Sequence, residues 1–116
     1  MNARMMLFRL LFVLSFCTAF AQTPPSEKTV TLTNIPYYSE LALAGADDYQ
    51  RAQCRLDLRY PADRKGFATV VWFHGGGLEH GHRHLVDLKD PSIAVAAVGY
   101  RLSPKVPHPG YLEDAG

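Results

Sequence analysis

Three consecutive glycines directly after an apolar segment constrain this chain more than any other feature. The segment Phe67–Phe73 reads FATVVWF and runs without interruption into His74 and then Gly75–Gly77. Glycine loses more backbone freedom on folding than any other residue, so three in a row are costly to order. They suit a place where the main chain must adopt conformations that a Cβ forbids, or where another molecule must approach the bare backbone. The pattern therefore predicts a strand that ends in a specialised loop.

Residues 1–21 have the layout of a cleavable secretory signal peptide. Arg4 and Arg9 give the segment a positively charged start. The apolar core Leu10–Phe16 follows, and Ala19–Ala21 supplies the small-x-small pattern of a cleavage site. The apolar core is too short to span a bilayer as a helix. We therefore expect a secreted or periplasmic protein with no stable membrane span after cleavage, and an uncleaved N-terminal anchor is the alternative.

The same pattern predicts the first residue of the mature protein. Cleavage is expected after Ala21, because signal peptidase cuts behind a small-x-small sequence, and this leaves Gln22 as the new N-terminus. N-terminal sequencing of the exported protein should therefore begin at Gln22. An intact Met1 on membrane-bound material would contradict the prediction.

The mature chain is short enough to hold one domain at most. Residues 22–28 form a polar spacer, and residues 29–116 are expected to be the N-terminal part of that domain. Cys54 is the single cysteine after the signal peptide, so no internal disulfide can form and its thiol is expected to be buried among apolar groups. The net charge of +1 is spread along the chain, which gives no basic patch for nucleic acid.

Hydrophobic patterning predicts an α/β fold. Thr29–Thr33 (TVTLT) and Cys54–Tyr60 (CRLDLRY) alternate polar and apolar residues, which indicates strands with one buried and one wet face. Phe67–Phe73 and Ile93–Val98 are almost continuously apolar, which is typical of parallel strands covered on both faces. The sequence therefore predicts a mostly parallel sheet with an antiparallel N-terminal edge.

The segments between and after these strands predict loops. Ala42–Asp48 (ALAGADD) is interpreted as a loop, with a single helical turn as the alternative, and Pro61–Gly66 (PADRKG) carries a turn signal. Pro107–Ala115 predicts a loop that leads into a helix near Tyr111, and the sequence stops where that helix should develop. We expect a truncated chain that does not fold stably alone, because its two apolar strands would lack covering helices.

With these elements placed, the glycine segment resembles a known motif. His74–Gly77 resembles the HGGG sequence of the α/β-hydrolase fold, in its carboxylesterase and lipase branch (the hormone-sensitive-lipase-like group). Val98–Pro104 resembles the strand of that family that ends in a Tyr-Arg-Leu-small-Pro turn, and Leu112–Ala115 resembles the opening of its next helix. Leu56–Pro61 resembles its second strand. The resemblance covers nearly all of the mature chain.

The resemblance implies a serine hydrolase that cleaves small carboxylic esters through an acyl-enzyme intermediate, without a cofactor or a metal. In such an enzyme the backbone N–H groups of Gly76 and Gly77 would form the oxyanion hole, which stabilises the negative oxygen of the tetrahedral intermediate. Gly75 would permit the turn, and His74 would support the loop by hydrogen bonding rather than act as a base.

The nucleophile of such an enzyme is not found in this sequence. A nucleophile elbow reads G-x-S-x-G, and the four serines of the mature chain all lack the flanking glycines: Ser26, Ser39, Ser92 and Ser103. Since the triad order in this fold is Ser, then Asp or Glu, then His, the whole triad would lie beyond Gly116. We therefore expect the 116 residues to be inactive alone. A non-catalytic truncated relic is one alternative, and a lipase, a formamidase or an acetyl-carbohydrate esterase are others.

Two further interpretations compete for the same region. A dinucleotide-binding loop that starts at Gly75 would need a glycine where His80 stands, and no Gly-Lys-Ser/Thr follows to make a P-loop. His80, His82 and His84 would share one face of an extended segment and could bind zinc. No Cys, Asp or Glu stands at a convincing spacing for a fourth ligand, so solvated loop histidines are the expectation.

Overall fold

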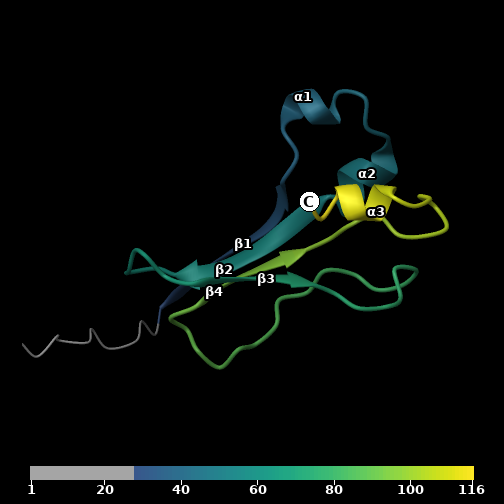
Figure 1. Cartoon of the computed structure of the whole chain (residues 1–116). Coiled ribbons are helices and arrows are strands. Elements are labelled where there is room, and N and C mark those ends of the chain that lie inside the picture. Colours follow the sequence, from purple (N-terminus) through teal and green to yellow (C-terminus); the bar gives the residue numbers. More distant parts are fainter. Residues whose placement is uncertain (1–27) are drawn as a thin grey trace, which may run out of the picture.

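The computed structural model describes residues 28–116, so the predicted signal peptide and all of the polar spacer except Lys28 lie outside the described part. Four strands form one sheet in the order β1-β2-β4-β3, with short helices at its margins (Figure 1). The strands are β1 (Thr29–Pro36), β2 (Arg55–Pro61), β3 (Thr69–Phe73) and β4 (Ala94–Val98), and the helices are α1 (Glu40–Leu43), α2 (Asp48–Gln53) and α3 (Gly110–Glu113). Within this range no helix has the length and apolarity needed to cross a bilayer.

The sheet is mixed, with two antiparallel pairings and one parallel pairing. β2 runs antiparallel to β1 on one side and to β4 on the other, whereas β3 and β4 are parallel, with Val71 opposite Ala96. The antiparallel N-terminal edge is confirmed, but the described strands do not form a mostly parallel sheet. The reason is that β2 is reversed relative to both of its neighbours, and side-chain alternation carries no information about strand direction.

The two apolar strands differ in burial because they occupy different places in the sheet. β4 lies between β2 and β3, and all five of its residues are buried. β3 pairs on one side only, and Val71, Trp72 and Phe73 remain 56%, 39% and 40% exposed. The lack of cover that was expected for both apolar strands is therefore seen for β3 only, because within residues 28–116 no further strand or helix covers this edge, whereas β4 is flanked by two strands.

The exposed edge predicts that the segment Gln22–Gly116, expressed alone, self-associates. An edge strand offers unpaired N–H and C=O groups to another chain, and a lysine on that edge opposes the pairing. We expect sedimentation to show oligomers without a cooperative thermal transition, and Val71→Lys to shift the segment toward monomer. Thr31→Lys adds the same charge on the polar edge strand β1 and should leave the association unchanged. A soluble wild-type monomer with a cooperative melt would contradict the prediction.

β2 departs from the expected pattern of one buried and one wet face. Its residues have intermediate exposure up to the buried Pro61. The loop after Gly81 covers the charged side of the strand: Arg83 Nε lies 3.2 Å from Asp57 Oδ1, and Arg59 Nη2 donates to Val86 O at 3.2 Å. The expectation of a wet face is therefore wrong, because a loop distant in sequence pairs with the charges of the strand.

Two short helices flank the predicted loop Ala42–Asp48: its first two residues belong to α1 and its last to α2, whereas residues 44–47 lie in neither helix. Ser39 caps α1, with its Oγ accepting from Ala42 N at 3.2 Å, and Asp47 caps α2, with its Oδ1 accepting from Gln50 N at 2.7 Å. The spacing Asp-x-x-Gln is a helix-start signature that was visible in the sequence. As a consequence β2 begins one residue later than predicted, and Cys54 ends α2 instead. The burial of Cys54 is confirmed, at 1% exposure with a free thiol.

Candidate functional site

The glycine loop, residues 74–80, follows the carboxyl end of β3 (Figure 1). Gly76 and Gly77 have φ angles of +126° and +64°, a region that side-chain-bearing residues rarely adopt. A Cβ on Gly76 would lie 2.0 Å from the carbonyl oxygen of His80, whereas one on Gly77 would meet nothing within 4 Å. Position 76 therefore requires glycine both because of its positive φ and because a Cβ would collide with the backbone. Position 77 requires glycine because of its positive φ alone. At Gly75 φ lies outside this region and a Cβ has room.

Within the glycine loop, the Gly76 carbonyl accepts hydrogen bonds from the loop itself, whereas two backbone N–H groups donate none to the described residues. Gly76 O accepts from the N–H groups of Glu79 and His80 at 3.2 and 3.1 Å. In the part of the chain that the structure describes, the N–H groups of Gly76 and Gly77 have no acceptor, and both residues are exposed. Successive free N–H groups in such a turn form a concavity that suits negative charge. The loop therefore leaves two adjacent N–H groups available to an acceptor.

His74 lies buried at the base of the loop, with 4% exposure. Its ring stacks on the ring of Tyr100, with centroids 4.5 Å apart and planes inclined by 14°. Its Nδ1 lies 2.9 Å from Gly75 O, and because a carbonyl oxygen only accepts, we assign the proton to Nδ1. Its Nε2 is buried and has no hydrogen-bond partner among residues 28–116. The contacts tie the imidazole to the loop.

The chain after β4 holds the glycine loop at two points, His74 and Leu78. The Tyr100 hydroxyl donates to His74 O at 2.6 Å, and Ser103 N donates to Leu78 O at 2.8 Å. Burial raises the pKa of Tyr100, so its hydroxyl keeps the proton that it donates. The free N–H groups of the loop lie between these two attachment points.

An open hollow of about 240 Å³ lies beside the base of the glycine loop. It is lined by residues from β3, from the glycine loop, from the chain after β4 and from α3 with the residues that follow it, which are Phe73, His74, Leu78, Tyr100, Tyr111, Leu112 and Ala115. This mostly apolar lining suits an alkyl group better than a charged one. A second hollow, near Arg59 and Lys89, is lined by charged side chains and lies at the opposite end of the sheet.

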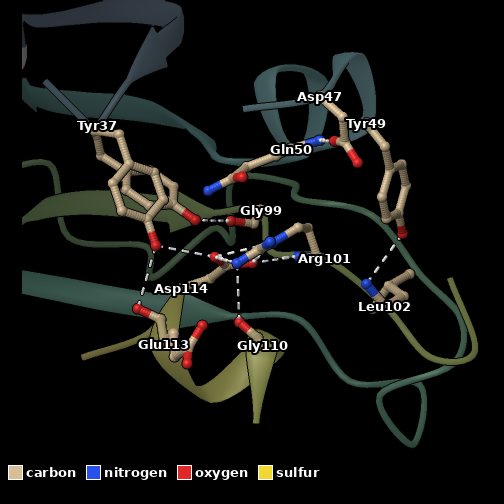
Figure 2. Close-up of polar contacts among 11 residues, drawn as sticks. Tyr37, Asp47, Tyr49, Gln50, Gly99, Arg101, Leu102, Gly110, Glu113 and Asp114 are labelled. Atoms are coloured by element: carbon tan, nitrogen blue, oxygen red, sulfur yellow. Dashed lines mark hydrogen bonds and ion pairs between the residues drawn. The ribbon is translucent and has the colours of Figure 1, made fainter. Parts of the chain in front are cut away.

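A buried ion pair near the site was missed by the sequence analysis. Figure 2 shows the Arg101 guanidinium against the Asp114 carboxylate, with Nη2–Oδ1 at 2.7 Å and Nε–Oδ2 at 2.9 Å. The two side chains are 15% and 0% exposed. Tyr38 also donates to Asp114 Oδ1 at 3.0 Å. Arg101 and Asp114 belong to separate motifs of the sequence, and their opposite charges are the sequence signal that links them.

These donors control the protonation of the buried carboxyl group. Burial by itself would raise the pKa of Asp114, but hydrogen bonds from Arg101 and Tyr38 outweigh it and hold that pKa below its usual range. Burial, together with the hydrogen bond to Asp114, raises the pKa of Tyr38 to about 12. At neutral pH the cluster therefore contains a carboxylate, a guanidinium and a neutral phenol.

The histidines after the loop do not assemble into a metal centre. Among residues 28–116 no group of three or more His, Cys, Asp or Glu side chains is arranged to hold a metal ion. The rings of His82 and His84 are 6.1 Å apart, and His84 lies edge-on to Trp72 at 6.4 Å. The zinc-module interpretation therefore has no geometric support in the described part.

Comparison with known proteins gives one informative result. No protein-family model and no curated protein sequence matches the chain. Solved structures do, among them three of esterase B from Lactobacillus rhamnosis, each at 28% sequence identity with TM-scores of 0.52, 0.52 and 0.51. The chain resembles part of a bacterial esterase.

The match to esterase B is partial. It covers 83% of this chain but only 30% of the length of esterase B. Two of those structures hold inhibited esterase B, one with a C6-C4 SN3 inhibitor and one with a C4-C4 SN3 tributyrin phosphonate. The resemblance to a piece of an α/β-hydrolase esterase, predicted from the HGGG segment, is thus confirmed at the level of a small mixed α/β unit.

Proposed function

We propose that this chain supplies the oxyanion loop of a serine hydrolase that cleaves carboxylic esters through an acyl-enzyme intermediate. The main support for this proposal is the pair of adjacent N–H groups at Gly76 and Gly77, which have no acceptor among the described residues. They follow the end of a strand in a chain that resembles part of an esterase. When a hydroxyl group attacks an ester carbonyl, the carbonyl oxygen becomes negative. N–H groups that are already oriented stabilise this oxygen without reorganisation.

The residues of the glycine loop have separate tasks in this proposal. Gly76 and Gly77 donate hydrogen bonds to the oxyanion, and His74 supports the loop from beneath. Its Nδ1–H is engaged by Gly75 O and its ring is stacked on Tyr100, so we assign it no role as a base. The nucleophile and the acid–base pair come from sequence beyond Gly116, and the mechanism uses no cofactor or metal.

The apolar hollow supports a substrate with a short alkyl group. Phe73, Leu78 and Leu112 contribute apolar surface beside the loop that would receive the reacting carbonyl. Inhibition of esterase B by a tributyrin phosphonate is consistent with short acyl esters as the substrate class. Export to the periplasm or the exterior, inferred from residues 1–21, completes the proposal.

Translation past the codon for Gly116 provides the test. We expect the encoding DNA to continue in frame to a G-x-S-x-G segment, and the full-length protein to hydrolyse p-nitrophenyl butyrate. Treatment with a tributyrin phosphonate should abolish this activity by modifying the serine. A stop codon after Gly116, or an intact G-x-S-x-G protein without ester turnover, would contradict the proposal.

A further inference from the structure

We propose that Asp114 is a positioning residue that sets the geometry of the glycine loop through Arg101 and the segment Tyr100–Ser103. This segment, Tyr100–Ser103, is the strap. The catalytic consequence of this proposal rests on the proposed function, whereas its structural content stands on the contacts of the strap.

The first step is that Asp114 forms a hydrogen bond with the main chain of the strap. Asp114 Oδ2 accepts from the backbone N–H of Arg101 at 2.9 Å, in addition to the side-chain ion pair. The Arg101 guanidinium also reaches Gly110 O at 3.3 Å, so it joins the strap to both ends of α3 (Figure 2). Because the Asp114 side chain is fully buried, these bonds have no competition from water.

The second step is that the remaining residues of the strap hold the glycine loop at two points and α2 at a third. Tyr100 donates to His74 O and stacks on the His74 ring. Leu102 N donates to the Tyr49 hydroxyl of α2 at 3.0 Å, as Figure 2 shows. Ser103 N donates to Leu78 O at 2.8 Å. The two contacts with the glycine loop are therefore made by the residues on either side of the Arg101 anchor.

The third step is that the backbone conformation of the glycine loop depends on the positions of the two strap residues that bind it. The loop bonds to itself through Gly76 O and through the contact of His74 Nδ1 with Gly75 O, and it reaches the strap at His74 and Leu78. Gly76 and Gly77 lie between these points, so a shift of the strap changes the direction of their N–H groups. A displacement of about 1 Å in a catalytic group can cost on the order of 100-fold in rate.

The test compares Asp114→Asn with Glu113→Gln in the full-length protein. Both variants remove one carboxylate from neighbouring positions, but Glu113 is exposed whereas Asp114 is buried. With ¹⁵N-glycine labelling, Asp114→Asn should shift the amide signals of Gly76 and Gly77, and Glu113→Gln should leave them in place. For p-nitrophenyl butyrate, Asp114→Asn should lower kcat by at least about tenfold while KM changes by less than about twofold.

Two milder variants keep the test decisive if Asp114→Asn does not fold. Arg101→Lys retains the positive charge but loses the two-pronged contact with Asp114, and Tyr100→Phe removes the bond to His74 O while it keeps the stacking. Both should move the same glycine signals. Unchanged glycine signals in folded Asp114→Asn or Arg101→Lys would overturn the proposal. If the wild-type protein shows no ester turnover the proposed function fails, and the glycine signals alone still decide the role of Asp114.

Discussion

Gly77→Ala is expected to lower kcat for ester hydrolysis by about 100- to 1,000-fold, the usual effect of losing one oxyanion donor. Gly77 has φ +64° with open space around the missing Cβ, so the substitution acts through backbone preference rather than through a clash. An alanine favours negative φ, which turns the N–H away from the oxyanion. Steady-state kinetics of the full-length protein with p-nitrophenyl butyrate measure the effect.

Matched variants separate the loss of a donor from general strain. Gly66 has φ +68° and open space, like Gly77, but lies in the turn between β2 and β3. Gly66→Ala should cost about 1–2 kcal/mol of stability and leave kcat unchanged. Gly76→Ala should be at least as damaging as Gly77→Ala, because its Cβ also collides with His80 O. Turnover that survives Gly76→Ala and Gly77→Ala would show that the oxyanion assignment is wrong.

The remaining residues of the region should be less sensitive. Gly75→Ala is expected to reduce kcat less than Gly77→Ala, since a Cβ meets no atom within 4 Å there and φ is not positive. Asn in place of His80, His82 or His84 should change kcat far less than either loop glycine.

Arg101→Met is expected to lower the free energy of unfolding by about 3–5 kcal/mol, because it leaves Asp114 as a buried charge without its partner. Methionine retains much of the apolar stem, so the loss reports mainly on the charge. Urea denaturation of the full-length protein measures it. The double variant Arg101→Met with Asp114→Leu should recover most of the loss, since an apolar pair in place of a buried ion pair is often neutral. A single-variant cost below about 1 kcal/mol would place the pair among weak surface bridges.

The same pair predicts a direction of pH dependence. The folded-state pKa of Asp114 lies below its usual value, whereas an unfolded aspartate titrates near about 3.9. Its contribution to stability is therefore complete above that unfolded value and is lost as the pH falls through the folded one. Between about pH 5 and pH 1, the wild-type protein should lose more stability than Arg101→Met, which no longer depends on that ionisation in the same way. Equal losses in the two proteins would contradict this assignment.

The sequence alone determined the features that depend on neighbouring residues. A continuous apolar segment predicted the buried β4, and alternation predicted β1 and β2 as strands. The HGGG segment predicted a loop at the end of β3, because consecutive glycines mark a backbone that needs unusual dihedral angles. The Asp-x-x-Gln cap of α2 belonged to the same class of local signal and was overlooked.

Only the tertiary structure decided the features that depend on which segments meet. Strand order made β3 an exposed edge and β4 a buried centre, although both have the same apolar character. The reversal of β2 against two neighbours made the sheet mixed, and a distant loop covered its charged face. The strap, with Asp114 holding Arg101 beside the glycine loop, arises from contacts between three segments. Periodicity reports which face of a segment is apolar, whereas the identity of the neighbour at that face is set by the packing of the whole sheet.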